Sequence, residues 1–111
     1  MKEFTGTWLR PDGTPAAGAK LGFVLSQDAV AEDGSATLGH YPVEVTLDET
    51  GSINSGSLEG IMMYANDELL PSGTTYVVWV RDPQFGRIYF ERLSIVGESP
   101  INLNAIAPAL Q

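Results

Sequence analysis

The carboxylates are the residues whose number and spacing come nearest to a chemical site. The chain of 111 residues carries 14 Asp and Glu residues against 6 Lys and Arg residues. Two neighbouring carboxylates can serve as acid and base in hydrolysis, and Asp48 with Glu49 and Asp67 with Glu68 form such neighbours. Adjacent residues on a turn point to different sides, however, and Asp favours turns because its side chain bonds to nearby backbone. We interpret both pairs as turn residues.

A metal site is the next chemistry to weigh. Residues 27–39 contain Asp28, Glu32 and Asp33, but a calcium loop needs a D-x-D-x-[DN]-G spacing, which these three do not have. The chain has no cysteine, which excludes disulfides and thiolate ligands. We therefore expect no bound metal and interpret this segment as a solvated acidic loop.

Nucleophilic catalysis has little support in the sequence. His40 is the single histidine, and no G-x-S-x-G motif supplies an activated serine for it. The glycines punctuate turns and form no phosphate-binding pattern. The expectation is a protein that is not an enzyme and uses no cofactor.

The formal net charge of −8 bears on partners. Phosphate backbones and anionic membrane surfaces would be repelled, so nucleic acid and membrane are not expected partners. The first residues lack the apolar run of a signal peptide, and no window reaches the roughly 18 apolar residues of a membrane span. We expect a chain made in the cytoplasm of the cell that produces it.

Short alternating segments bounded by Gly, Pro, Asn and Asp predict strands throughout the chain. The segments are 4–9, 19–26, 41–47, 52–58, 74–81, 87–96 and 101–103, with 59–64 as either a buried strand or a half-buried bend. Their number and spacing predict an all-β fold, a two-sheet antiparallel β-sandwich of seven or eight strands. We expect one domain over residues 1–104 and a C-terminal tail over 105–111, with the tail either crossing to a neighbouring subunit or fraying.

Three details of these strands are predicted as well. Tyr41, Val43, Val45 and Leu47 alternate in sequence and are expected to point inward. The alternation slips within 87–96, which predicts a β-bulge near Glu91 and Arg92. Residues 27–39 form the longest irregular stretch and are expected to be a projecting contact loop, with one helical turn around residues 29–31 as the alternative.

An interface is predicted on the most apolar strand. Tyr76, Val78 and Val80 share one face of residues 74–81, and Val77 and Trp79 share the other. One set fills the core, and the other needs a covering, so we favour a subunit interface over a solvent-exposed face. The interface candidates are Val77 and Trp79, together with Asp28, Glu32 and Asp33 of the projecting loop.

A second hypothesis concerns Tyr64, Asn66 and Asp67. An exposed aromatic ring stacks on sugars, and neighbouring amide and carboxylate groups bind hydroxyls. These three residues would serve a carbohydrate- or receptor-binding adhesion module that recognises a host glycan or receptor. The alternative to a binding role is that each aromatic side chain is buried in the hydrophobic core.

Four segments together carry a family resemblance. They are GTWLRPDGTPAAGAKLGF at 6–23, VEVTLDETGSI at 43–53, LPSGTTYVV at 70–78, and INL at 101–103 before a Pro-containing tail. Their order resembles the prealbumin-like (transthyretin-like) β-sandwich modules and the related carboxypeptidase-regulatory-like domains. It looks most like the versions found in bacteriophage virion proteins: tail fibres, minor tail proteins, and head fibres or decoration proteins.

The resemblance implies a non-catalytic structural module, usually one copy among many in an oligomer or fibre. Expected partners are therefore other virion proteins and further copies of the chain, and the expected location is the virion. The chain matches neither the hormone-channel residues of transthyretin nor a hydrolase motif, so neither of those functions is carried over.

Overall fold

Strands dominate the structure, a computed structural model that describes residues 1–54 and 60–107. The strands are β1 Lys2–Thr5, β2 Lys20–Leu25, β3 Ala29–Ala31, β4 Thr37–Leu38, β5 Val43–Thr46, β6 Ile61–Met63, β7 Leu69–Leu70, β8 Tyr76–Asp82, β9 Gly86–Leu93 and β10 Ile101–Asn102. Two 3₁₀ helices, η1 Asn66–Glu68 and η2 Leu103–Ala105, complete the elements of the described residues. The all-β prediction is confirmed.

The largest sheet is antiparallel and has the strand order β5-β2-β8-β9. Its side chains alternate between two faces, as the pleat requires. The inner face presents Leu21 and Phe23 of β2 beside Val80 and Val78 of β8, and all four are buried. The central strands β2 and β8 therefore form the floor of the hydrophobic core.

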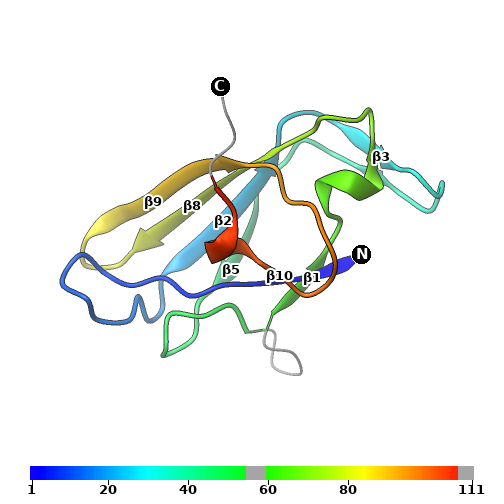
Figure 1. Cartoon of the computed structure of the whole chain (residues 1–111). Coiled ribbons are helices and arrows are strands. Elements are labelled where there is room, and N and C mark those ends of the chain that lie inside the picture. Colours follow the sequence, from blue (N-terminus) through cyan, green and yellow to red (C-terminus); the bar gives the residue numbers. More distant parts are fainter. Residues whose placement is uncertain (55–59, 108–111) are drawn as a thin grey trace.

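A second sheet brings the first and last strands together. β1 lies between β10, with which it pairs in parallel, and β6, with which it pairs antiparallel. The fully buried Phe4 of β1 has its ring centroid 6.1 Å from that of Phe23 and 6.2 Å from that of Tyr76. β1 thus packs across the inner face of the larger sheet (Figure 1).

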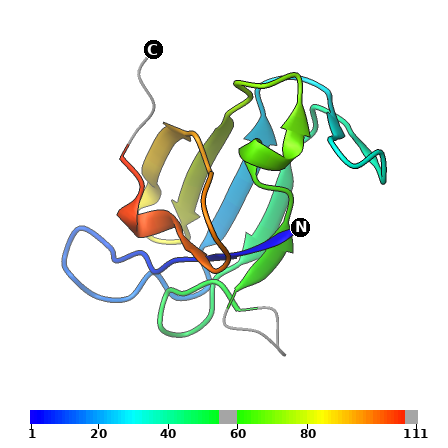
Figure 2. The same cartoon turned by 45° about the vertical axis from the view of Figure 1, so that its right-hand side comes forward.

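The third sheet is small and has the order β4-β3-β7. Its β3–β4 hairpin projects beyond the end of the four-stranded sheet in both views (Figures 1 and 2). Residues 27–39 were predicted to be irregular, but they contain β3 and β4 because β7 offers β3 a partner distant in sequence. Three sheets and ten strands in the described residues thus replace the predicted two sheets of seven or eight strands.

Two local predictions need correction. The bulge lies opposite Val80 and Arg81, whose partners are Tyr89 and Arg87, so Ile88 is the extra residue. It sits close to the tight β8–β9 turn and not near Glu91. Tyr41 is not inward: it precedes the edge strand β5 and is 79 % exposed.

The packed part of the chain continues past residue 104. Ile106 is half-buried and packs against the core beside η2. Residues 108–111 of the predicted tail, and most of the predicted strand 52–58, lie outside the described residues.

No helix in the described part of the chain has both the length and the apolar character needed to cross a membrane.

Candidate functional site

The outer face of the four-stranded sheet carries large apolar side chains that its own core does not use. The core of the described residues includes Tyr76, Val78 and Val80 but not Val77 or Trp79, which are half-buried on the opposite face. The predicted division of β8 into two apolar faces is therefore confirmed. Phe90 of β9 is paired with Trp79, lies on the same face, and is 52 % exposed.

The indole of Trp79 lies directly against the backbone of Gly22. The two residues are cross-strand partners, and a Cβ atom built on Gly22 would stand only 2.1 Å from an indole carbon. Glycine weakens a strand unless something covers it closely. Here the Trp79 ring covers Gly22. Because Gly22 has no Cβ atom, the indole packs directly on the backbone of β2, and part of the ring stays exposed.

Basic side chains surround this aromatic pair. Arg81 follows Trp79 at the alternating position and is paired with Lys20 of β2. The guanidinium carbon of Arg87 lies 4.6 Å from the centre of the Phe90 ring, a cation–π contact. Arg92, paired with Val77, donates from Nη1 to Thr75 Oγ1 at 3.2 Å.

This face holds every basic residue that lacks a carboxylate partner among the described residues. Of the six Lys and Arg residues, Lys2 binds Asp67 at 3.0 Å and Arg10 binds Asp82 at 2.8 Å. The other four are Lys20, Arg81, Arg87 and Arg92. Strand pairing places one described carboxylate, Glu44 of β5, on the same face opposite Gly22. The sheet face is therefore locally basic on a chain with a net charge of −8.

The predicted acidic residues lie elsewhere, around the β3–β4 hairpin. Asp28, Glu32 and Asp33 are all exposed. Asp28 accepts the backbone N–H of His40 at 2.6 Å. The side-chain and backbone hydrogen bonds of Ser35 lower the pKa of Asp33 and keep it ionised. The structure does not bring these residues beside Val77 and Trp79, because the hairpin extends past the end of the sheet (Figure 1).

An apolar groove of about 450 Å³ runs beside these acidic residues. It is lined by Asp28, Ala29, Val30, Thr37, Leu70 and Pro71. Val30 is 42 % and Leu70 is 47 % exposed. This groove could not be predicted from the sequence, because β3 and β7 are far apart in the chain and meet only through their pairing.

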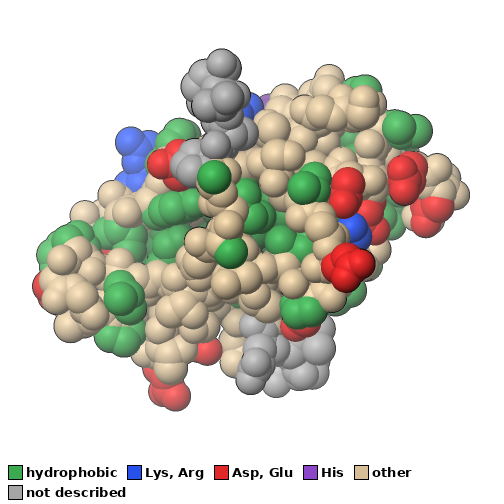
Figure 3. All heavy atoms as spheres, in the orientation of Figure 1, with side chains coloured by type: hydrophobic (Ala, Val, Ile, Leu, Met, Phe, Trp, Pro, Cys, Tyr) green, Lys and Arg blue, Asp and Glu red, His purple; other side chains and the backbone are tan. Residues whose placement is uncertain are grey.

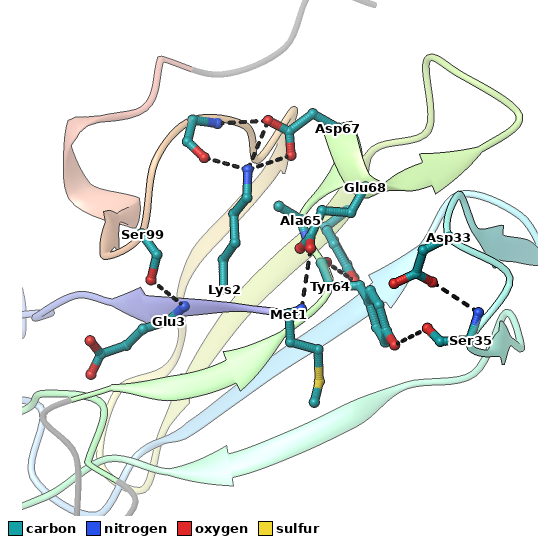
Figure 4. Close-up of polar contacts among 12 residues, drawn as sticks. Met1, Lys2, Glu3, Asp33, Ser35, Tyr64, Ala65, Asp67, Glu68 and Ser99 are labelled. Carbon is teal, nitrogen blue, oxygen red and sulfur yellow. Dashed lines mark hydrogen bonds and ion pairs between the residues drawn. The ribbon is translucent and has the colours of Figure 1, made fainter.

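The three candidate ligand-binding residues occupy separate environments. Figure 4 shows the Tyr64 hydroxyl beside Ser35, with an oxygen–oxygen distance of 3.0 Å, and Asp67 beside Lys2. Asp67 also accepts the backbone N–H of Gly97 at 3.1 Å. The backbone oxygen of Tyr64 accepts the Tyr76 hydroxyl at 2.8 Å, and burial raises the pKa of Tyr76 to about 12.

Asn66 is buried and ties three segments together. Its Oδ1 accepts the backbone N–H of Ile95 at 2.7 Å, and its Nδ2 donates to Thr74 Oγ1 at 3.1 Å. Buried polar groups need such partners. The carboxamide of Asn66 therefore contributes to the fold and does not form an exposed surface with Tyr64 and Asp67.

A polar groove of about 620 Å³ lies beside β1 instead. Its lining includes Thr5, Thr7, Asp48, Thr50, Ser52, Asn54, Asn102 and Asn104. Asn102 Oδ1 accepts the N–H of Asn104 at 3.0 Å, and Asn104 Oδ1 accepts the N–H of Thr7 at 2.6 Å. These bonds fix both carboxamides. Sequence reasoning missed the groove because its residues come from distant segments, although the closely spaced Asn102 and Asn104 were a signal.

Asp48 supplies the carboxylate of this polar groove. Its Oδ1 accepts the Thr50 hydroxyl at 2.7 Å and the backbone N–H groups of Thr50 and Ser52 at 2.9 and 3.0 Å. The hydrogen bond from the Thr50 side chain is the largest cause that lowers the pKa of Asp48. The groove thus combines amide donors, hydroxyls and an ionised acceptor.

Residues 1–54 and 60–107 contain no cluster of side chains that could bind a metal, and His40 makes structural contacts. No three His, Cys, Asp or Glu side chains in these ranges are placed to hold a metal ion. The Nδ1 atom of His40 contacts the backbone oxygen of Leu25. This contact, with the bond from His40 N–H to Asp28, anchors the segment after β4.

In comparisons with known proteins, no family model and no curated protein matches the chain.

Proposed function

We propose that the chain is a non-catalytic structural module of a bacteriophage virion, in a head or tail accessory protein such as a decoration protein or tail fibre. It acts through contacts with other virion proteins and with further copies of itself. The observation that carries this proposal is the outer sheet face. There, Trp79, Val77 and Phe90 are surrounded by basic residues that have no carboxylate partner in the described parts of the chain. Aromatic and arginine side chains together are typical of protein interfaces.

The arrangement of the sheets supports the family part of the proposal. The sheet of β1 packs across the inner face of the four-stranded sheet, which is the layering that a prealbumin-like sandwich requires. The motifs at 6–23, 43–53 and 70–78 point to the same family. In this proposal β3, β4 and β7 are an addition at one end of the two-sheet sandwich.

The first test is the mass of the purified chain in solution, measured by light scattering from micromolar to millimolar concentration. A mass that rises with concentration, and falls when Trp79→Ala is introduced, is the expected result. A Tyr41→Ala variant serves as the matched control, because Tyr41 is exposed away from this face. A monomer at every concentration that also fails to bind purified virion components would refute the proposal.

A carbohydrate- or receptor-binding module is the second candidate, and the polar groove favours it. Amides fixed by backbone bonds and an ionised carboxylate are groups that bind sugar hydroxyls. The groove replaces Tyr64, Asn66 and Asp67 as the place where a host glycan would bind.

A glycan array probed with the purified chain tests this candidate. Binding that is lost in Asn104→Ala and kept in Gln27→Ala, an exposed residue distant in the chain, would support it. Binding that is unchanged in Asn104→Ala, or no binding to any glycan, would count against the groove.

A further inference from the structure

We propose that the acidic end of one copy docks on the basic sheet face of the next, so that copies associate head to tail. The inference rests on the proposed function, because it names the partner of that same face. The basic face consists of Lys20, Val77, Trp79, Arg81, Arg87, Phe90 and Arg92. The acidic tip consists of Asp28, Val30, Glu32, Asp33 and Leu70.

Each of the two surfaces has an apolar centre with charged residues around it, and the charges of the two surfaces are opposite. The basic face has an exposed aromatic centre, with Phe90 52 % exposed and the Trp79 indole beside it. The acidic tip has the apolar groove of about 450 Å³, which Val30 and Leu70 line. Strong interfaces combine a buried apolar centre with a polar rim. An aromatic side chain of one copy therefore has an apolar recess to enter on another.

Charge decides which surfaces meet. The four basic residues of the face have no carboxylate partner among the described residues, and the chain around them is acidic. Two basic faces placed together would oppose four cations with four cations, which disfavours a symmetric pair. The acidic tip offers Asp28, Glu32 and Asp33 instead, and alternation puts Asp28 and Glu32 on the side of β3 where Val30 is exposed.

Within one molecule, the acidic tip does not contact the basic face. β3 is held by β4 and β7, and the hairpin points away from the four-stranded sheet (Figures 1 and 2). Figure 3 shows red acidic side chains gathered at the hairpin end, with blue side chains at the opposite, upper-left edge near β9. The acidic tip of one copy can therefore bind a basic face only on a neighbouring copy.

The net charge of −8 does not prevent this contact. At physiological ionic strength charges farther apart than about 8 Å are largely screened, so the charges at the contact dominate. A contact between two different surfaces of the same chain repeats until it closes a ring or forms an open chain. Such repetition suits a protein that covers a particle or builds a fibre.

Two charge-reversal variants test the inference by light scattering and sedimentation. The face variant carries Arg81→Glu and Arg87→Glu, and the tip variant carries Glu32→Lys and Asp33→Lys. Each keeps one intact surface. We expect each variant alone to associate at least about tenfold more weakly than the natural chain. A control variant makes the same change of charge as the tip variant but elsewhere, with Glu49→Lys and Glu98→Lys at exposed residues outside both surfaces. It should associate like the natural chain.

Mixing gives the decisive result. The intact tip of the face variant fits the intact face of the tip variant, and the two reversed surfaces are also opposite in charge. The mixture should therefore associate more strongly than either variant alone. A tip variant that associates as strongly as the natural chain would overturn the inference. So would a natural chain that is monomeric yet binds a virion component through Trp79, an outcome that leaves the proposed function intact. A monomer that binds nothing would overturn both.

Discussion

At the scale of single residues, the glycine beneath the half-buried Trp79 sets the shape of the basic face. Gly22 lies inside β2, where a glycine has no side chain to pack, and Trp79 covers it. The sequence alone predicted that Val77 and Trp79 point away from the core. It did not reveal that Gly22 holds the indole low, because that requires the register between β2 and β8.

Gly22→Ala should disturb this surface more than it disturbs the fold. The added methyl group would stand 2.1 Å from the indole, so the ring must swing outward, and a swing costs less than moving backbone. We expect the free energy of unfolding to change by less than about 1 kcal/mol, and the NMR signal of the Trp79 indole N–H to shift strongly.

Gly39→Ala is the matched control for that measurement. A methyl group there meets no atom within 4 Å, so the indole signal should stay in place. A Gly22→Ala spectrum identical to that of the natural chain would contradict the contact between Gly22 and Trp79.

Asp82 is the residue whose ionisation should matter most for stability in acid. Its side chain is fully buried, binds Arg10, and accepts the backbone N–H groups of Gln84 and Phe85 at 2.8 and 3.1 Å. Burial alone would raise the pKa of Asp82, but the Arg10 bond and the two backbone donors outweigh it and leave the pKa below 3.8.

The lowered pKa gives a definite pH dependence. A carboxyl group with a folded pKa below its unfolded value stabilises the fold above the unfolded pKa, and that stability is lost as the pH falls through the folded pKa. Urea unfolding should therefore show the natural chain weakening below about pH 4. Asp82→Asn should be less stable at neutral pH and lose less on acidification. Glu49→Gln, an exposed turn residue, should keep the natural profile.

At the scale of elements, the predictions succeeded where one strand's own alternation decides the structure. Segments 19–26 and 74–81 contain β2 Lys20–Leu25 and most of β8 Tyr76–Asp82. The β3–β4 hairpin was missed because three-residue and two-residue strands carry almost no periodic signal and depend on a partner such as β7.

The candidate surfaces were predictable to different degrees. Periodicity in β8 predicts that Val77 and Trp79 share the face opposite the core. It does not predict that Arg87 joins them, because the bulge at Ile88 changes the phase of β9. The polar groove needed the pairing of β1 with β10, which joins segments about as far apart as the chain allows.

η1 depends on one buried side chain for its attachment. Asn66→Ala would leave the Ile95 N–H and the Thr74 hydroxyl without their partners, and a buried unsatisfied group costs about 1–3 kcal/mol. We expect chemical denaturation to show a loss of about 2–6 kcal/mol for the two groups together. Gln27→Ala, which is exposed, should lose little. A loss near zero for Asn66→Ala would contradict the structural role of these two hydrogen bonds.

At the scale of the whole molecule, charge separates into an acidic majority and one basic face. The 14 acidic residues oppose 6 basic ones, and four of those six share the outer sheet face. The excess negative charge opposes the compact state through self-repulsion, while the basic face attracts an acidic partner. Added salt weakens both effects.

Salt should therefore act on folding and on association in opposite directions. In the tip variant, kept at a concentration where it is monomeric, raising the salt concentration should raise the melting temperature by a few degrees because repulsion is screened. In the natural chain the same change should lower the mass in light scattering. Calorimetry and scattering on the same samples would check both. A mass that grows with salt would indicate an apolar contact without charge pairing.

The parallel pairing of β1 with β10 has a mechanical consequence. The chain enters this pair at the start of β1 and leaves it past the end of β10. Tension that draws residue 1 and residue 107 apart therefore pulls the two strands lengthwise in opposite directions. Their hydrogen bonds share that load and must fail together, whereas a hairpin pulled open at its ends loses its bonds one by one. The fold is thus built to bear stretching along this direction.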